Sequence, residues 1–66
     1  MQPHQQRVVD ELNDLEDKIR KLTDFILSDK FTAIVPDQDE RDRMIIQNAQ
    51  MNAYANTLLE RIKNFN

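Results

Sequence analysis

The chain has 66 residues with no cysteine and no glycine, and its 12 acidic and 9 basic side chains give a formal net charge of −3. The lack of cysteine excludes disulfides and thiolate metal sites, and a single histidine leaves little for a zinc site. The acidic balance argues against a protein that coats DNA or RNA, because such proteins carry excess lysine and arginine. A chain this short gains only about 3–5 kcal/mol from its own core, so oligomerisation is the remaining way to stabilise it.

The first predicted helix covers residues 3–28. Pro3 suits the first turn of a helix, where its missing N–H costs nothing. An apolar ladder then recurs at alternating four- and three-residue steps: Val8, Leu12, Leu15, Ile19, Leu22 and Ile26. The exposed face carries acid–base pairs four residues apart, each worth about 0.2–0.5 kcal/mol: Asp14/Lys18, Glu16/Arg20 and Asp17/Lys21. The pattern predicts an amphipathic helix.

The next segment, residues 29–37, is predicted to connect two helices. Its run of β-branched residues is too short for a long helix and allows one helical turn, in which Phe31 and Ile34 are expected to tuck under the helix ends. Pro36 then requires an extended residue before it. Asp37 is the expected N-cap of the following helix, with Glu40 as its capping-box partner.

The second predicted helix covers residues 38–64. Its seam keeps the rhythm of the first: Met44, Asn48, Met51, Ala55, Leu58, Ile62 and Phe65. Asn48 stands where an apolar residue is expected, so it either fixes register and oligomer state or lies partly in water near a helix crossing. Tyr54 lies beside the seam, where it either packs with its hydroxyl at the rim or stacks on a ligand.

Two helices of matched length and a short connector predict an all-α fold, an antiparallel α-hairpin forming a single domain over residues 1–66. A splayed pair that shares helices with other chains fits the same pattern. Further apolar residues beside both seams widen the two faces beyond what one partner helix covers, which predicts a helical homo-oligomer.

Catalysis is a poor fit to this composition. The chain has no glycine for a glycine-rich phosphate loop, no cysteine, and only one serine and one histidine for a Ser/His/acid set or a metal cluster. We therefore expect no catalytic residue, no metal, no cofactor and no enzyme activity. No stretch approaches the apolar length of a membrane span, and the opening MQPHQQR lacks the layout of a signal peptide. These features predict a cytosolic protein.

Three residues of the first helix are candidate ligand contacts: His4, Arg7 and Lys18. Lys18 lies fourteen residues beyond His4, on nearly the same face but about 21 Å away, so one chain cannot grip a small ligand between them. If two copies of this helix pack antiparallel about a twofold axis, His4 of one chain approaches Lys18 of the other. That pair would offer a planar ring for stacking and a cation for phosphate. The alternative is an exposed terminal histidine and an ion-paired lysine.

Two runs of the chain resemble a known family: PHQQRVVDELNDLEDKIRKLTDFILSDKF and MNAYANTLLERIKNF. They follow a first-helix layout Q-x-R-V-(V/I)-x-E-x-x-x-L-x-x-K-(I/L)-x-K-L-x-x-F-(I/L) and a second-helix layout M-x-x-Y-x-x-x-L-x-x-R-I. The residues that carry the resemblance are Arg7, Val8, Glu11, Leu15, Lys18, Leu22, Phe25, Met51, Tyr54, Leu58, Arg61 and Ile62. The chain thereby resembles the anti-CBASS cyclic-oligonucleotide sponges, a family of small phage proteins.

The resemblance implies a homohexamer that sequesters cyclic nucleotide second messengers of CBASS defence, such as cGAMP, in the host bacterial cytoplasm without cleaving them. Cyclic dinucleotides would lie between pairs of protomers. His4 takes the place of a stacking tyrosine, and Lys18, or Lys21 one turn away, corresponds to a lysine of the family; Arg7 is a further phosphate contact.

The resemblance also implies a second pocket, for cyclic trinucleotides, with Arg43, Gln47 and Gln50 as its candidate residues. Two other classes of function are compatible with a small helical protein. A structural or adaptor coiled coil that receives a partner's helix is the main alternative. A DNA-binding helical repressor is disfavoured by the acidic balance and the lack of a basic recognition helix.

Overall fold

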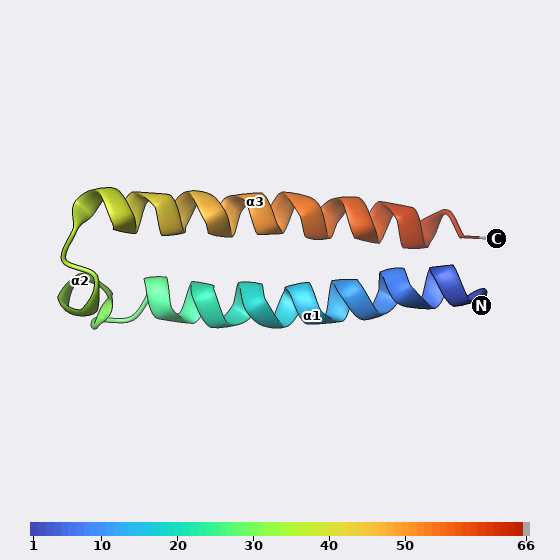
Figure 1. Cartoon of the computed structure of the whole chain (residues 1–66), viewed down its shortest axis with the longest axis horizontal. Coiled ribbons are helices and arrows are strands. Elements are labelled where there is room, and N and C mark those ends of the chain that lie inside the picture. The colour runs from blue at the N-terminus through green and yellow to red at the C-terminus, as the bar shows by residue number, and fades with distance from the viewer. Residues whose placement is uncertain (66) are drawn as a thin grey trace.

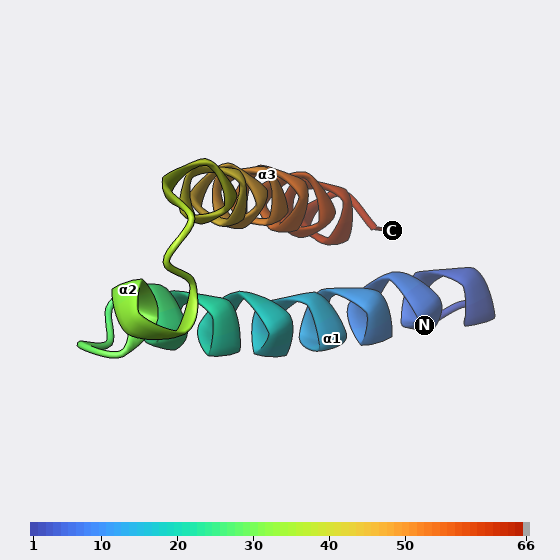
Figure 2. The same ribbon diagram turned by 60° about the vertical axis from the view of Figure 1, so that its left-hand side comes forward.

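The computed structural model describes residues 1–65, which form two long helices and one short one: α1 (Pro3–Ile26), α2 (Phe31–Ile34) and α3 (Gln38–Lys63). The long helices run antiparallel side by side, with both chain ends at the same end of the rod (Figure 1). The short α2 lies beside the end of α1, and the chain then crosses to α3 (Figure 2). The prediction of an all-helical fold with two long helices that pack against each other is confirmed.

The end of α1 comes two residues earlier than the sequence predicts. The helix ends at Ile26 and Leu27 is its C-cap, whereas the apolar pattern favoured Ser28. Ser28 bonds to the Phe25 carbonyl twice, through its backbone N–H at 3.1 Å and its hydroxyl at 2.8 Å. Because these bonds reach back only three residues, they close the last turn tightly and end the α-helix.

The start of α3 is capped by Asp37, as predicted. The carboxylate of Asp37 accepts a hydrogen bond from the Asp39 backbone N–H at 3.2 Å. Glu40, the expected capping-box partner, instead accepts a hydrogen bond from Arg43 Nε at 2.8 Å. The helix ends at Lys63, one residue before the predicted end.

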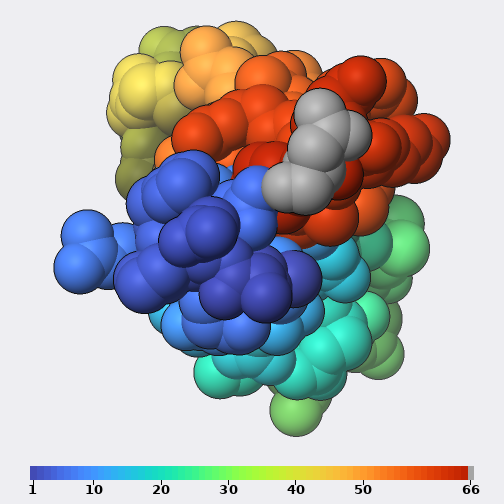
Figure 3. Space-filling view, turned by 90° about the vertical axis from the view of Figure 1, so that its right-hand side faces the viewer, coloured from blue at the N-terminus to red at the C-terminus, as the bar shows by residue number. Residues whose placement is uncertain are grey.

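The core lies in the half of the hairpin that holds the chain ends. Its buried members come from the two apolar ladders: Val8, Leu12, Leu15, Ala55 and Leu58. Leu58 is the centre of this cluster, with 0% of its surface exposed. Seen from this end, the first turns of α1 lie directly against the last turns of α3 (Figure 3). Helical periodicity alone therefore selects the residues that hold the two long helices together.

The other half of the hairpin is closed by the connector. Phe31, at the start of α2, is buried, and its ring meets that of Phe25 edge to face at a centroid distance of 5.4 Å and an angle of 75°. Arg41 Nη1 donates to the carbonyl oxygens of Val35 and Pro36, each at 2.8 Å. Ile34 is 61% exposed, so only Phe31 tucks under the helix ends as expected.

Asn48 bonds to α1 within the same chain. Its Nδ2 donates to Thr23 Oγ1 at 3.1 Å, and both side chains are half-buried. The amide therefore sits at the contact between α1 and α3 with a polar partner, so its burial there carries little desolvation cost. A role for Asn48 in oligomer register stays a prediction.

A single chain leaves much apolar surface uncovered. The molecule measures 47 × 15 × 14 Å and exposes 4985 Å², whereas a compact monomer of its 7.9 kDa mass would expose about 4,400 Å². Ile45, Ile46 and Leu59 are exposed on α3. These three residues, called the outer face of α3 below, keep 48%, 55% and 40% of their surface exposed.

Candidate ligand-binding site

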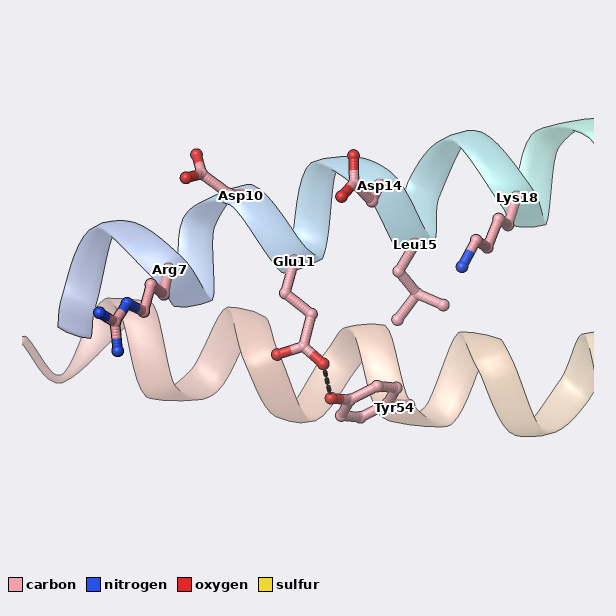
Figure 4. A pocket seen from close by; sticks show the side chains of 7 residues that line it. All are labelled: Arg7, Asp10, Glu11, Asp14, Leu15, Lys18 and Tyr54. Carbon is pink, nitrogen blue, oxygen red and sulfur yellow. Dashed lines mark hydrogen bonds between the residues drawn. The ribbon is translucent and has the colours of Figure 1, made fainter. Parts of the chain in front are cut away.

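A groove between α1 and α3 brings Arg7, Lys18 and Tyr54 together (Figure 4). Its volume is about 360 Å³. This groove is called the Tyr54 groove below. Its lining residues are Arg7, Asp10, Glu11, Asp14, Leu15, Lys18 and Tyr54. All but Tyr54 belong to α1, where steps of three and four residues place them on one side of the helix.

The position of the groove follows from the core beside it. Leu15 is buried and forms part of the core, so the side chains around it stand at the edge of the contact between the helices. On α3, Tyr54 directly precedes the buried Ala55 and therefore lies at the same edge. The packing of the two seams thus determines that the polar side chains of the groove lie at the edge of the contact between α1 and α3.

The Tyr54 groove has an acidic balance, with three carboxylates and two cations among its lining residues. The side chains of Asp10 and Asp14 point away from α3, whereas Glu11 reaches across to it (Figure 4). Lys18 forms no salt bridge with any residue of the described part, 1–65, so the predicted pair with Asp14 is absent there. Its ammonium is available to a ligand.

Glu11 and Tyr54 are joined across the groove by a hydrogen bond. The Tyr54 hydroxyl donates to Glu11 Oε2, as Figure 4 shows. This bond raises the pKa of Tyr54 above its ordinary value, with smaller contributions from burial and from the negative charge of Glu11. Tyr54 is therefore a neutral phenol at physiological pH, with its hydroxyl held at the rim of the groove. A hydroxyl at the rim was one of the two alternatives for Tyr54 drawn from the sequence, and neither alternative identified Glu11 as its partner.

The charged face next to the groove differs from the predicted pairs. Asp17 pairs with Lys21 at 2.9 Å, as expected, and also with Arg20, which had been assigned to Glu16. The hydrogen bonds from Lys21 and Arg20 lower the pKa of the Asp17 carboxyl. All three side chains are exposed to water, so these pairs contribute little to stability.

The remaining predicted site residues are spread along the hairpin. His4 is exposed in the first turn of α1 and does not line the Tyr54 groove. Arg43 pairs with Glu40 at 2.8 Å and lies 3.8 Å from Asp37, near the connector. Gln50 is exposed on α3. Within one chain, then, Arg7 and Lys18 share a groove, but His4 does not join them.

A second groove lies further along the hairpin, toward the connector. Its volume is about 390 Å³. This groove is called the Phe25 groove below. Its lining residues are Lys18, Lys21, Leu22, Phe25, Gln47 and Met51. Lys18 thus lines both grooves, and Gln47 is the one predicted trinucleotide contact among these residues. Sequence reasoning missed Phe25 and Met51 as site residues because Met51 fits an ordinary seam position and Phe25 fits an apolar position beside the seam.

Metal binding and membrane insertion find no support in the described residues. In residues 1–65, no three or more histidine, cysteine or acidic side chains gather where they could hold a metal ion. In that same part of the chain, no helix combines the length and the apolar character needed to cross a membrane.

The fold and its grooves define a small all-helical protein with two grooves along the contact of two antiparallel helices. The model of the Sequestin family matches residues 2–64, and the chain belongs to this family. No curated protein and no solved structure matches it. The name of the family denotes the sequestering of a ligand, which fits the sponge-type protein expected from the sequence.

Proposed function

We propose that this protein binds cyclic di- or oligonucleotide second messengers of bacterial CBASS defence and sequesters them without degrading them. It would act as a phage immune-evasion protein in the host bacterial cytoplasm. The observation that carries the proposal is the match to the Sequestin family over residues 2–64. The match spans nearly the whole chain, which supports assigning the proposed sequestering role to the hairpin itself.

The side chains of the Tyr54 groove support a nucleotide as the ligand. Arg7 and Lys18 are donors for phosphate oxygens, and charge-assisted hydrogen bonds of this kind are about twice as strong as neutral ones. The ring of Tyr54 offers a plane on which a base can stack, and so does the imidazole of His4. None of these roles requires a catalytic group, so we propose that the ligand leaves the protein chemically unchanged.

The charge balance of the groove supports binding between subunits. A cyclic dinucleotide carries two negative charges, whereas one Tyr54 groove holds more carboxylates than cations. A second chain must therefore contribute cations. In the proposed homohexamer, two α1 helices pack antiparallel about a twofold axis, which brings His4 of one chain toward Lys18 of the other. The uncovered outer face of α3 supports assembly of this kind.

The proposed second pocket, for cyclic trinucleotides, is less well supported within one chain. Arg43 is engaged with Glu40 and Asp37, and Gln47 lines the Phe25 groove. Together with Gln50, these residues lie on α3 within two helical turns, so several copies of α3 around a threefold axis would gather them. This pocket stays a prediction.

Calorimetric titration with cyclic di-GMP, cyclic di-AMP, cGAMP and cyclic tri-AMP tests the proposal, together with a mass measurement by light scattering. We expect at least one tight ligand, a hexameric mass, and ligand recovered intact after the protein is denatured. If no member of the panel binds, the proposed function is refuted.

The role of Lys18 has its own test. Lys18→Ala should weaken binding about tenfold or more, because a hydrogen bond to a charged group is worth about 1.5–3 kcal/mol, and should leave the oligomer unchanged. The matched control is Lys30→Ala, since Lys30 is exposed in the connector and lines neither groove. Equal affinities for the two variants would remove Lys18 from the site.

The outer face of α3 favours a second candidate function, an adaptor that binds the helix of another protein. Ile45, Ile46 and Leu59 provide the apolar anchors that a helix-in-groove contact uses. This alternative predicts a small oligomer, a defined protein partner and indifference to nucleotides. A hexamer that binds a cyclic nucleotide would contradict it.

A further inference from the structure

The two grooves of the hairpin differ in charge and in lining. The Phe25 groove contains two lysines and no carboxylate, whereas the Tyr54 groove has more carboxylates than cations. Leu22, Phe25 and Met51 give the Phe25 groove an apolar lining, and Gln47 is its one neutral polar side chain. A groove with an apolar lining and a cationic rim suits a ligand that has a flat apolar part and a negative charge.

The ring of Phe25 is held in place by the connector. Phe31 is buried at the start of α2 and meets Phe25 edge to face, at a centroid distance of 5.4 Å. Phe25 itself is half-buried, so part of its ring remains open to the groove. A ring that is already oriented loses little freedom when a base stacks on it. The short α2 thereby helps to orient the Phe25 ring, because it holds Phe31 against it.

Both lysines of the Phe25 groove can donate to an anion. Lys18 forms no salt bridge with any of residues 1–65. Lys21 pairs with Asp17 at 2.9 Å, but both side chains are open to water, and such pairs are weak. An ammonium group has three N–H donors, so Lys21 can hold this carboxylate and a phosphate oxygen together.

We propose that the Phe25 groove is a nucleobase-binding subsite formed within a single chain. The base stacks on Phe25 against the thioether of Met51, and the carboxamide of Gln47 bonds to the edge of the base. The adjoining phosphate lies at Lys18 and Lys21. Because Lys18 also lines the Tyr54 groove, it joins this subsite to the site described above. The inference rests on the proposed function and adds a position for one base of the cyclic nucleotide.

Methyl NMR on the full-length protein tests this placement directly. The chain has three methionines, and of these Met51 lines the groove. The probe is the tightest binder among cGAMP, cyclic di-AMP and cyclic di-GMP in the titration described above. We expect the Met51 methyl resonance, assigned with Met51→Leu, to move upfield on binding through the ring current of the base. The resonances of Met1 and Met44 should move much less.

Affinity measurements provide a second readout. Phe25→Leu keeps an apolar side chain but removes the ring, and should weaken binding about tenfold, because stacking of a base on an aromatic ring is worth about that much or more. The matched control, Phe65→Leu, makes the same change at the opposite end of the hairpin and should bind within twofold of the wild type. Gln47→Ala should weaken binding severalfold. Because Gln47 is exposed, this variant should keep the fold and so provides the test if Phe25→Leu unfolds.

The outcomes separate this inference from the proposed function. If a cyclic dinucleotide binds but the Met51 methyl does not move, or if Gln47→Ala binds as tightly as the wild type, the Phe25 groove is not the subsite and the proposed function stands. A second copy of the chain seated on the groove would give this same unmoved resonance and would count against the inference. If no member of the panel binds, the proposed function fails and the inference falls with it.

Discussion

Leu58→Ala is the substitution that most directly tests the core. Leu58 is the one side chain among the described residues with 0% exposure, and it packs among Val8, Leu12, Leu15 and Ala55. The change removes three carbon atoms, which at about 0.8 kcal/mol each amounts to about 2.4 kcal/mol of transfer free energy. The cavity left behind brings the total to about 3 kcal/mol or more. A chain of this size has only about 3–5 kcal/mol from its own core.

Circular dichroism at 222 nm, followed on heating, measures this loss. A cost of about 3 kcal/mol should lower the melting temperature by about 12–24 °C in a chain of this length. The matched control is Leu27→Ala, because Leu27 is 79% exposed and should cost less than about 0.5 kcal/mol. Both variants must be compared at one protein concentration, since assembly would make the melting temperature depend on it. Melting temperatures within a few degrees of each other would refute this description of the core.

Two further predictions concern the polar contacts between the long helices. Glu11→Gln should lower the pKa of Tyr54 toward its ordinary value of about 10, because it removes the carboxylate that accepts the phenolic proton. Ultraviolet titration of the phenol measures this pKa directly, since the chain has one tyrosine. The raised pKa implies a stabilisation that is complete below about pH 10 and is lost as the pH rises through the pKa of the folded state. Asn48→Ala and Thr23→Val should each lower the free energy of unfolding by about 1 kcal/mol. The double variant should lose less than the sum of the two, by about 0.5 kcal/mol or more. Additive losses in thermal melts would mean that the two side chains do not interact.

The helices could be predicted from the sequence because their cause is local. Apolar residues at three- and four-residue steps specify a helix and its buried face without reference to the rest of the chain. All five buried core residues were accordingly members of the two predicted ladders. The ends of the helices were less accurate, because the end of α1 depends on how Ser28 places its hydroxyl. Several bonding patterns are open to a serine near a helix end, and the sequence does not choose among them.

The grooves could not be predicted because they depend on how α1 and α3 slide past each other. Glu11 and Tyr54 lie 43 residues apart in the chain, and they meet only in the register that the connector sets. The same holds for Phe25 and Met51, which come from different helices. A shift of one turn, about 5.4 Å, would give both grooves other linings. Lys18 was identified from its spacing from His4 along the first helix and from the family pattern around it, whereas the partners that surround it came from the structure.

Charge connects the proposed binding to the proposed assembly. A chain of net charge −3 repels a dianionic ligand at long range, so binding depends on cations gathered close to the phosphates. Lys18 is such a cation and lines both the Tyr54 and Phe25 grooves, and contact between two chains would add the imidazole ring of the partner's His4 beside it for stacking. A ligand held at such a contact binds the assembled form more tightly than the separated chains, so by mass action it stabilises the assembly. Substitutions that remove the apolar side chains of the outer face of α3 should then weaken nucleotide binding. They should do so although Ile45, Ile46 and Leu59 line neither groove.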